Sequence, residues 1–493
     1  MTRMTRKILA LGFAALLAGC GRGADYVPPA SPTGDGYTQN GVPAMPPAQG
    51  AAGQHFALGA KISGEWWKLF RAPSLDDVLT QAVAGNRTLA AANATLLQAH
   101  EAVNVAAAGF YPRVDFGASA ERERNNFKAV GLTGFPPKEF NVYSLGPTVS
   151  YTFGLGGRVP KQVEQAAAQE QAQGYQLQAA YLTLTGSVVT EAITIASVRA
   201  QIKAVEDILT DDESNLRLVR DQLNAGAASD LDLQTATSQL AADRTLLPSL
   251  RQQLSAARHG LTVLVGKTPA GWVPPDFDLD QLVLPEELPV SLPSSLVRQR
   301  PDILVAEAQL HAASASVGVA NAELYPNITL SANLLQQFLK PEAIFDPASN
   351  IWGVGATLAA PLFHGGELQA KKRGAEDAFQ AALADYEQSV IESFRQVADL
   401  LDGLAHDSEM LSAEQAAYQS ASRALSLTRT SYSLGNSTLL QVLDAQRLFQ
   451  QARIGLAKAQ AQRYLDTAQL FVAMGGGWWE RNPTPTQAAQ TTP

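Results

Sequence analysis

The chain of 493 residues has few of the side chains that enzymes and metal proteins use for chemistry. Its single cysteine, Cys20, excludes an intrachain disulfide, a zinc knuckle and a cysteine cluster. Its six histidines are scattered, and no two of them form an HxxxH pair. The sequence has no GxSxG or P-loop motif, and no histidine stands beside a plausible nucleophile. The sequence therefore predicts that the protein is not an enzyme and that it holds no metal and no cofactor.

Basic residues are also in the minority, with 37 against 46 acidic residues and a net charge of −9. Residues 1–19 contain Arg3, Arg6 and Lys7 but no acid, so their removal changes the net charge from −9 to −12. This balance argues against nucleic acid as a partner, because nucleic-acid binding needs basic surface. Hydrophobic residues make up 46% of the chain, which excludes wholesale disorder.

The N-terminus predicts export. An apolar run, Ile8 to Ala18, follows three basic residues, but it is shorter than the roughly 20 residues of a membrane-spanning helix. It ends in Leu17-Ala18-Gly19-Cys20, the pattern of a bacterial lipobox, so we expect residues 1–19 to be a lipoprotein signal peptide. Cys20 would then carry S-diacylglycerol and N-palmitoyl groups; the alternative is an ordinary signal peptide with a chance cysteine. Gly21, rather than Asp, is typical of sorting to the outer membrane.

The chain contains two copies of one unit. Tyr111-Pro112 matches Tyr325-Pro326 at an offset of 214, and Gly156-Gly157 matches Gly365-Gly366 at an offset of 209. We place repeat 1 at 74–267 and repeat 2 at 294–477, joined by a proline-rich connector at 268–293. Residues 20–73 are expected to be a lipid-anchored, extended segment, and residues 478–493 a C-terminal tail.

The residue pattern of each copy predicts the same order of elements: a helix, two strands, a very long helix and a further helix. In repeat 1 we expect a helix at 74–109, strands at about 112–125 and 141–154, a long helix at about 160–224 and a helix at about 230–265. In repeat 2 we expect a first helix followed by strands at about 326–338 and 350–362, a long helix at about 367–433 and a helix at about 438–474.

The four predicted strands alternate apolar and polar residues, and each has about the 9–11 residues that cross an outer membrane. No segment after the signal is expected to be apolar enough for a spanning helix, so passage through a bilayer would use these strands. Four strands are too few for a barrel, and an open sheet edge cannot face lipid. A membrane role therefore demands an oligomer, of eight strands from two chains or twelve from three. The alternative is two hairpins of a soluble sandwich.

The first long helix has a heptad seam. Twelve of the fourteen residues at alternating spacings of four and three are apolar or aromatic, which predicts left-handed supercoiling. A solid bundle is the alternative, but the faces outside the seam are rich in Gln, Ser, Thr and Asp, which is typical of a wall with water on both sides. The seam residues are Leu177, Tyr181, Leu184, Val188, Glu191, Ile195, Val198, Ile202, Val205, Leu209, Asp212, Leu216, Val219 and Leu223.

Taken together, these features resemble the TolC-like outer membrane factors, specifically the NodT/OprM-like lipoprotein branch that works with RND efflux pumps. The motifs that carry the resemblance are Asp25-Tyr26-Val27-Pro28, Trp66-Trp67-Lys68-Leu69-Phe70, Arg300-Pro301-Asp302-Ile303, Tyr325-Pro326, Tyr432-x-x-Gly435, Val442-Leu443-Asp444-Ala445-Gln446 and Gly475-Gly476-Gly477-Trp478. Their order and spacing extend over nearly all of the mature chain.

The resemblance implies a mainly α-helical homotrimer. Twelve strands would form one β-barrel in the lipid of the outer membrane, continuous with a long coiled-coil α-barrel in the periplasm, and the connector with residues 21–70 would form a belt around it. The trimer would passively conduct drugs or other small solutes from an inner-membrane RND-type pump and a periplasmic adaptor (a membrane fusion protein) to the exterior. The alternative is a structural periplasmic coiled-coil lipoprotein that conducts nothing.

The resemblance also implies a periplasmic gate. The turns at Gly226 and Gly435 would form its tip, and Leu440 and Asp444 would point at the pore axis as an apolar constriction and a carboxylate ring. Tyr432 and Asp232 match positions that tie neighbouring helices together in the closed state. Two alternatives stay open: Asp444 could stabilise a helix dipole, and Leu440 could pack in the helix seam. Serines at 431 and 433 replace the basic residues that often flank the tip tyrosine, so salt bridges at the tip are expected to be weaker or differently placed.

Overall fold

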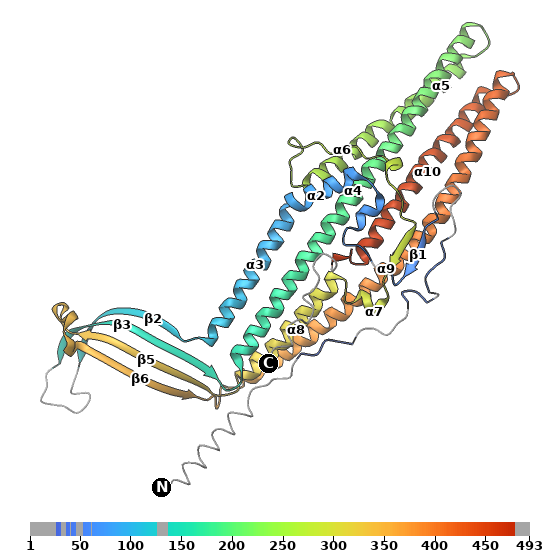
Figure 1. The fold of residues 1–493 in the computed structure, drawn as a ribbon. Coiled ribbons are helices and arrows are strands. Elements are labelled where there is room, and N and C mark those ends of the chain that lie inside the picture. Colours follow the sequence, from blue (N-terminus) through green and yellow to red (C-terminus); the bar gives the residue numbers. More distant parts are fainter. Residues whose placement is uncertain are drawn as a thin grey trace. The chain divides into compact units, whose positions relative to one another are not determined.

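The computed structural model describes residues 26–30, 36–39, 41–45, 53–60, 62–125 and 137–478 (Figure 1). The predicted signal peptide and Cys20 lie outside these residues, as does nearly all of the C-terminal tail. The chain divides into two compact units, each built from both halves of the sequence. The first contains Thr95–Gln173 and Ala306–Tyr386 together with the described residues 26–29. The second contains Ala30–Ala94, Gly174–Val305 and Glu387–Pro493.

The first unit contains one antiparallel sheet in the order β2-β3-β5-β6. Its strands are β2 (Arg113–Asn125), β3 (Lys138–Gly154), β5 (Asn327–Phe338) and β6 (Asn350–Ala359). The two hairpins join through β3 and β5 into a single sheet, which contradicts two facing hairpins of a sandwich. Within the described residues, the outer edges of β2 and β6 have no partner strand. Two short helices, η5 (Pro341–Phe345) and η6 (Pro347–Ser349), connect β5 to β6.

The strand register gathers the apolar side chains on one face. Val114 lies opposite Val149, Val149 opposite Ala332, and Ala332 opposite Val354. On the other face, the hydroxyls of Thr152 and Thr329 are hydrogen-bonded at 2.8 Å. Because side chains alternate between faces along a strand, the sheet has an apolar and a polar side. The apolar side is uncovered within the chain, with Val114 65% and Val354 78% exposed.

Among the described residues, the first unit includes parts of α3 (Arg87–Ala107), α4 (Arg158–Asn224), α8 (Pro301–Ala322) and α9 (Glu367–Ser433). The short helix η2 (Ala108–Phe110) follows α3. Glu164 on α4 pairs with Lys161 at 2.7 Å and with His311 of α8 at 3.2 Å. The ring of Tyr26 stacks on His311, with centroids 4.4 Å apart. The motif tyrosine, six positions after Cys20, is therefore fixed against α8.

The second unit has its core where the N-terminal segment and the connector meet. Strand β1 (His55–Leu58) pairs in parallel with β4 (Glu287–Val290), and η1 (Trp66–Phe70) is buried beside α2 (Pro73–Gly85). Trp66 is fully buried and stacks on Phe471 at 5.4 Å. Residues 20–73 are thus not extended throughout, because the large apolar side chains of η1 need burial. The connector also contains η4 (Leu279–Gln281) and leads into α7 (Pro293–Leu296).

Two helices that the sequence predicts as continuous are interrupted. The expected helix 74–109 ends its first part at Gly85, where the Asn86 side chain donates to the Leu264 carbonyl at 2.9 Å and accepts from the Leu89 amide. The expected helix 230–265 divides into α5 (Asp230–Arg244) and α6 (Leu246–Leu264). Pro248 lacks the amide hydrogen that would continue the α-helical pattern. The matching helix of the second copy, α10 (Leu439–Ala473), is unbroken.

Two of the described helices contradict the expectation that no later segment is apolar enough to cross a membrane. By length and composition alone, α4 and α8 each contain an 18-residue stretch that would suffice. However, 56% of the stretch in α4 and 39% of that in α8 is buried inside the chain. Much of this apolar character therefore serves packing within the protein.

The two long helices, α4 and α9, have 67 residues each, which corresponds to a length of about 100 Å at 1.5 Å per residue.

Candidate gate at the helix turns

The two predicted tip turns join α4 to α5 and α9 to α10, at the same end of the second unit (Figure 1). Gly226 and Gly435 follow the ends of the long helices with φ of 76° and 78°, a left-handed conformation that favours glycine. In both turns a backbone hydrogen bond spans the glycine and closes the turn. The Ala227 amide donates to the Gln222 carbonyl at 2.7 Å, and the Asn436 amide donates to the Ser431 carbonyl at 2.9 Å. Both copies therefore form the same helical hairpin.

Each turn ends in a capping box at the next helix. In the first copy, the Asp232 carboxylate accepts from the Ser229 amide at 2.9 Å and from its hydroxyl at 2.7 Å. The bond from the Ser229 amide holds the pKa of Asp232 below its usual value. In the second copy, Thr438 and Gln441 form the equivalent box. Within the described chain, the Asp232 carboxylate thus stabilises the start of its own helix.

Tyr432 connects the two copies beside the turns. Its hydroxyl, on α9, donates to Oε1 of Gln222 on α4 at 2.6 Å. Its ring packs against a small apolar cluster formed by Val219, Ala236, Leu439 and Leu443. The helix tie expected at Tyr432 is thus present within one chain, with Gln222 as its partner. Sequence reasoning missed Gln222, because its distance from Tyr432 along the chain conceals the contact.

A salt bridge also lies near the turn, although serines flank Tyr432. Arg429, one helical turn before Tyr432, pairs with Asp211 of α4 at 3.1 Å. Both side chains are partly exposed, so the pair contributes up to about 1 kcal/mol. The charged link between α4 and α9 is therefore placed further from the turn than the flanking positions.

Leu440 and Asp444 lie on one exposed face of α10. Leu440 is 69% exposed, whereas Val442 and Leu443 on the opposite face are buried. Leu440 therefore does not pack in the helix seam of its own chain. Asp444 lies beyond the first turn of α10, where a helix dipole has little effect on a carboxylate. Neither alternative to a gate role is favoured by this placement.

Asp444 has a basic neighbour that the sequence reasoning overlooked. Arg447 donates to the Asp444 carboxylate at 2.7 Å, three residues further along α10. Both side chains are about half exposed. The i,i+3 spacing was visible in the sequence and could have revealed the pair. Any ring of Asp444 side chains would accordingly carry alternating charges.

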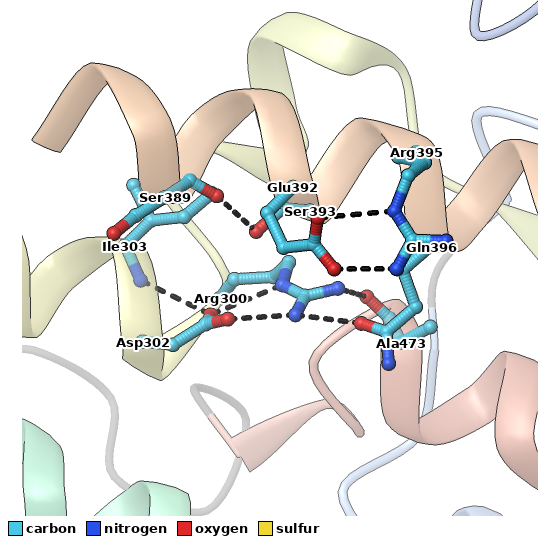
Figure 2. Close-up of polar contacts among 9 residues, drawn as sticks. All are labelled: Arg300, Asp302, Ile303, Ser389, Glu392, Ser393, Arg395, Gln396 and Ala473. Carbon is cyan, nitrogen blue, oxygen red and sulfur yellow. Dashed lines mark hydrogen bonds and ion pairs between the residues drawn. The ribbon is translucent and has the colours of Figure 1, made fainter. Parts of the chain in front are cut away.

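The Arg300-Pro301-Asp302 motif joins three helices away from the turns (Figure 2). The Arg300 guanidinium makes two bonds to the Asp302 carboxylate, at 3.0 and 2.7 Å. It also donates to Gln396 of α9 and to the Ala473 carbonyl, each at 2.9 Å. The last carbonyls of a helix lack intrahelical partners, so Arg300 satisfies the end of α10. The motif is therefore a structural junction in the second unit.

The described residues contain no group of three or more His, Cys, Asp or Glu side chains that could hold a metal ion. The lipidation predicted at Cys20 falls outside these residues and stays a prediction.

Known proteins share both the sequence and this fold. The family model described as outer membrane efflux protein matches residues 78–267 and 292–476. The pyoverdine export outer membrane protein OpmQ of Pseudomonas aeruginosa is 31% identical over 84% of this chain and 87% of its own length. The probable efflux pump outer membrane protein TtgC of Pseudomonas putida is 29% identical over 99% of both chains. Among solved structures, the outer-membrane channel OprN matches with a TM-score of 0.84 and 27% identity, over 93% of this chain and all of its own.

These matches confirm the resemblance inferred from the motifs, together with the outer-membrane location and the absence of an enzymatic role. Outer membrane efflux proteins are the channels of tripartite systems that also contain an adaptor and an inner-membrane pump. The chain belongs to the family of outer membrane efflux proteins.

Proposed function

We propose that three copies of the chain form a passive exit channel for drugs or other small solutes. The uncovered apolar face of the sheet carries this proposal. A four-stranded sheet with two open edges cannot stand alone in lipid, because unpaired backbone groups there are costly. If β2 of one copy pairs with β6 of the next, twelve strands close into a barrel with the apolar face toward lipid. The polar face, with Thr152 and Thr329, then lines the lumen.

In the same trimer, the helices of three copies would continue the lumen into a periplasmic α-barrel. The turns at Gly226 and Gly435 would form its narrow end, where the exposed Leu440 and Asp444 face the axis. Three leucines would form an apolar constriction, and three Asp444–Arg447 pairs would surround it with charge. Tyr432 and Asp232 would hold the helices near this end, Tyr432 through its bond to Gln222.

The proposed channel would work with two partner proteins. A periplasmic adaptor would bind around the helical end, and an inner-membrane RND-type pump would supply the energy that the channel lacks. The names of relatives mention pyoverdine, toluene, antibiotics and cations, so small solutes of several kinds suit a channel of this family.

We further propose that Cys20 carries diacylglycerol and palmitate, which would add a lipid anchor to the barrel.

The test is to extract the protein from outer membranes in mild detergent. A trimer band that disappears on boiling, together with single-channel conductance in planar bilayers, is the expected result. Material that is monomeric in detergent, or trimers without conductance, would contradict the channel; trimers without conductance would instead favour a structural coiled-coil lipoprotein.

A further inference from the structure

Two buried aspartates face each other between helices of the second unit. Asp212 on α4 is 3% exposed and Asp243 on α5 is 7% exposed. Both accept hydrogen bonds from the buried amides of α10: Gln446 donates to Oδ1 of Asp212, and Gln450 donates to Oδ2 of Asp243 at 3.2 Å. We refer to Asp212 and Asp243 as the carboxyl pair. It joins α4, α5 and α10 about three helical turns before the end of α4 at Asn224.

The carboxyl pair has fewer donors than two carboxylates need. Gln239 also donates to Oδ2 of Asp243, at 2.8 Å, but Oδ2 of Asp212 is buried without a donor among the described residues. Two negative charges at one buried position repel each other, and a buried acceptor without a donor is costly. A single proton shared by the carboxyl pair removes both problems, because it cancels one charge and supplies the missing donor.

The charges around the carboxyl pair do not replace this proton. Arg429 of α9 lowers the pKa of Asp212. One of its terminal amines bonds to Asp211 at 3.1 Å, and its buried Nε has no acceptor among the described residues. On α5, Arg244 pairs with the exposed Glu213 of α4 at 2.9 Å. The groups of α10 that face the pair are neutral amides. Burial, followed by Asp243 and Asp211, raises the pKa of Asp212 to about 7.

We propose that the carboxyl pair is a pH-sensitive lock, in which one shared proton holds α4, α5 and α10 together below the turns. Loss of the proton leaves two carboxylates in contact and favours separation of α5 from α4 and α10. The consequence for conduction rests on the proposed gate, because a looser helix packing would ease its opening. The proton itself does not depend on the gate.

The direction of the pH effect follows from linkage. In the opened helices an aspartate has a pKa near the reference value of 3.8, whereas in the packed helices Asp212 titrates at about 7. The packed state therefore binds more protons in this interval. The shared proton therefore stabilises the packed helices fully below about pH 4. This stabilisation falls as the pH rises and is lost above about pH 7. Opening of α5 should rise up to about tenfold for each pH unit within the interval, and should level off above it.

The experiment is hydrogen exchange of the α5 segment in detergent-solubilised protein between pH 5 and 8, corrected for the intrinsic exchange rate. Wild-type opening should rise with pH as described. Asp212→Asn keeps the size of the side chain and supplies a permanent donor, so α5 should stay protected at every pH. Asp221→Asn, which changes an exposed carboxylate on the same helix, should behave as wild type. Wild-type exchange that is independent of pH, or an Asp212→Asn variant that opens as wild type does at pH 8, would overturn the lock.

Infrared difference spectroscopy reports the proton directly. The carboxyl signal that titrates near pH 7 should lose part of its intensity in Asp212→Asn. Burial and Asp466 raise the pKa of Asp407 to about 7, so Asp407 should contribute a signal that persists in all variants. An unchanged signal in Asp212→Asn would count against the shared proton. Single-channel conductance separates this inference from the gate. Hydrogen exchange of α5 that changes with pH, together with conductance that does not, supports the lock but not the gate. Conductance that responds to Leu440 variants, together with exchange that is independent of pH, supports only the gate.

Discussion

The hydroxyl of Tyr432 on α9 donates a hydrogen bond of 2.6 Å to Oε1 of Gln222 on α4. This contact joins the last turn of one long helix to the last turn of the other, so each copy of the repeat restrains the turn of its counterpart. Its neighbour in sequence, Arg429, joins the same two helices by a salt bridge to Asp211. A polar and a charged contact therefore act together on the two hairpins whose separation would open the proposed gate.

Tyr432→Phe should loosen this contact without disturbing the packing of the ring. A hydrogen bond between side chains contributes about 1 kcal/mol, so the opening equilibrium should shift roughly fivefold. The measurement is the frequency of open events in single-channel recordings. Gln222→Met removes the acceptor and should have a similar effect. The double variant should add nothing further, because both changes remove one interaction; additive effects would show that the two residues act independently.

Replacing both Leu440 and Asp444 by Ala should raise single-channel conductance and admit large antibiotics into cells. The exposed leucine and carboxylate would no longer narrow the axis or charge it. Leu427→Ala provides the control, because Leu427 is 66% exposed but lies on α9, before the turn. Unchanged conductance in the double variant would remove these residues from the gate.

Arg447→Gln should make the channel more selective for cations. The substitution releases the Asp444 carboxylate from its 2.7 Å partner and leaves a purely negative ring. The check is the reversal potential in a salt gradient across a planar bilayer, which should move toward the cation equilibrium potential and shift less at high ionic strength. Lys458→Gln, further along α10, serves as a charge-matched control. An identical reversal potential in wild type and Arg447→Gln would mean that this pair does not face the conducting path.

Cys20→Ala should abolish incorporation of palmitate and still allow trimers to form, because the barrel would hold the protein in the membrane by itself. Metabolic labelling followed by gel analysis of outer-membrane fractions tests both parts. Incorporation of palmitate into the variant would refute the lipobox interpretation.

Local patterns placed the strands to within three residues at their ends, since β3 begins at Lys138 rather than 141 and β6 ends at Ala359 rather than 362. They also placed the turns, but not the contacts between distant helices. The faces of β2 and β3 follow from alternation, and the turns follow from glycines that can adopt positive φ. The four-residue strands β1 and β4 pair across more than 200 positions, which no local pattern encodes. Asp212 was visible as one of two charged residues in the heptad seam. The role of Asp212 depends on Asp243, and only the packing of α5 on α4 places Asp243 next to Asp212.

Val354→Arg should impair insertion into the outer membrane. The residue lies on the uncovered apolar face, opposite Ala332, and an arginine at the midplane of a bilayer costs about 2–4 kcal/mol. Leu145→Arg on β3, which lies on the same face, should have the same effect. Thr357→Arg is the matched control, because it stands on the same strand as Val354 but on the polar face, where a charge would remain in water. The measurement is the yield of heat-modifiable trimer in outer-membrane fractions. Equal yields from all three variants would mean that the apolar face does not meet lipid, and the twelve-stranded barrel would lose its main support.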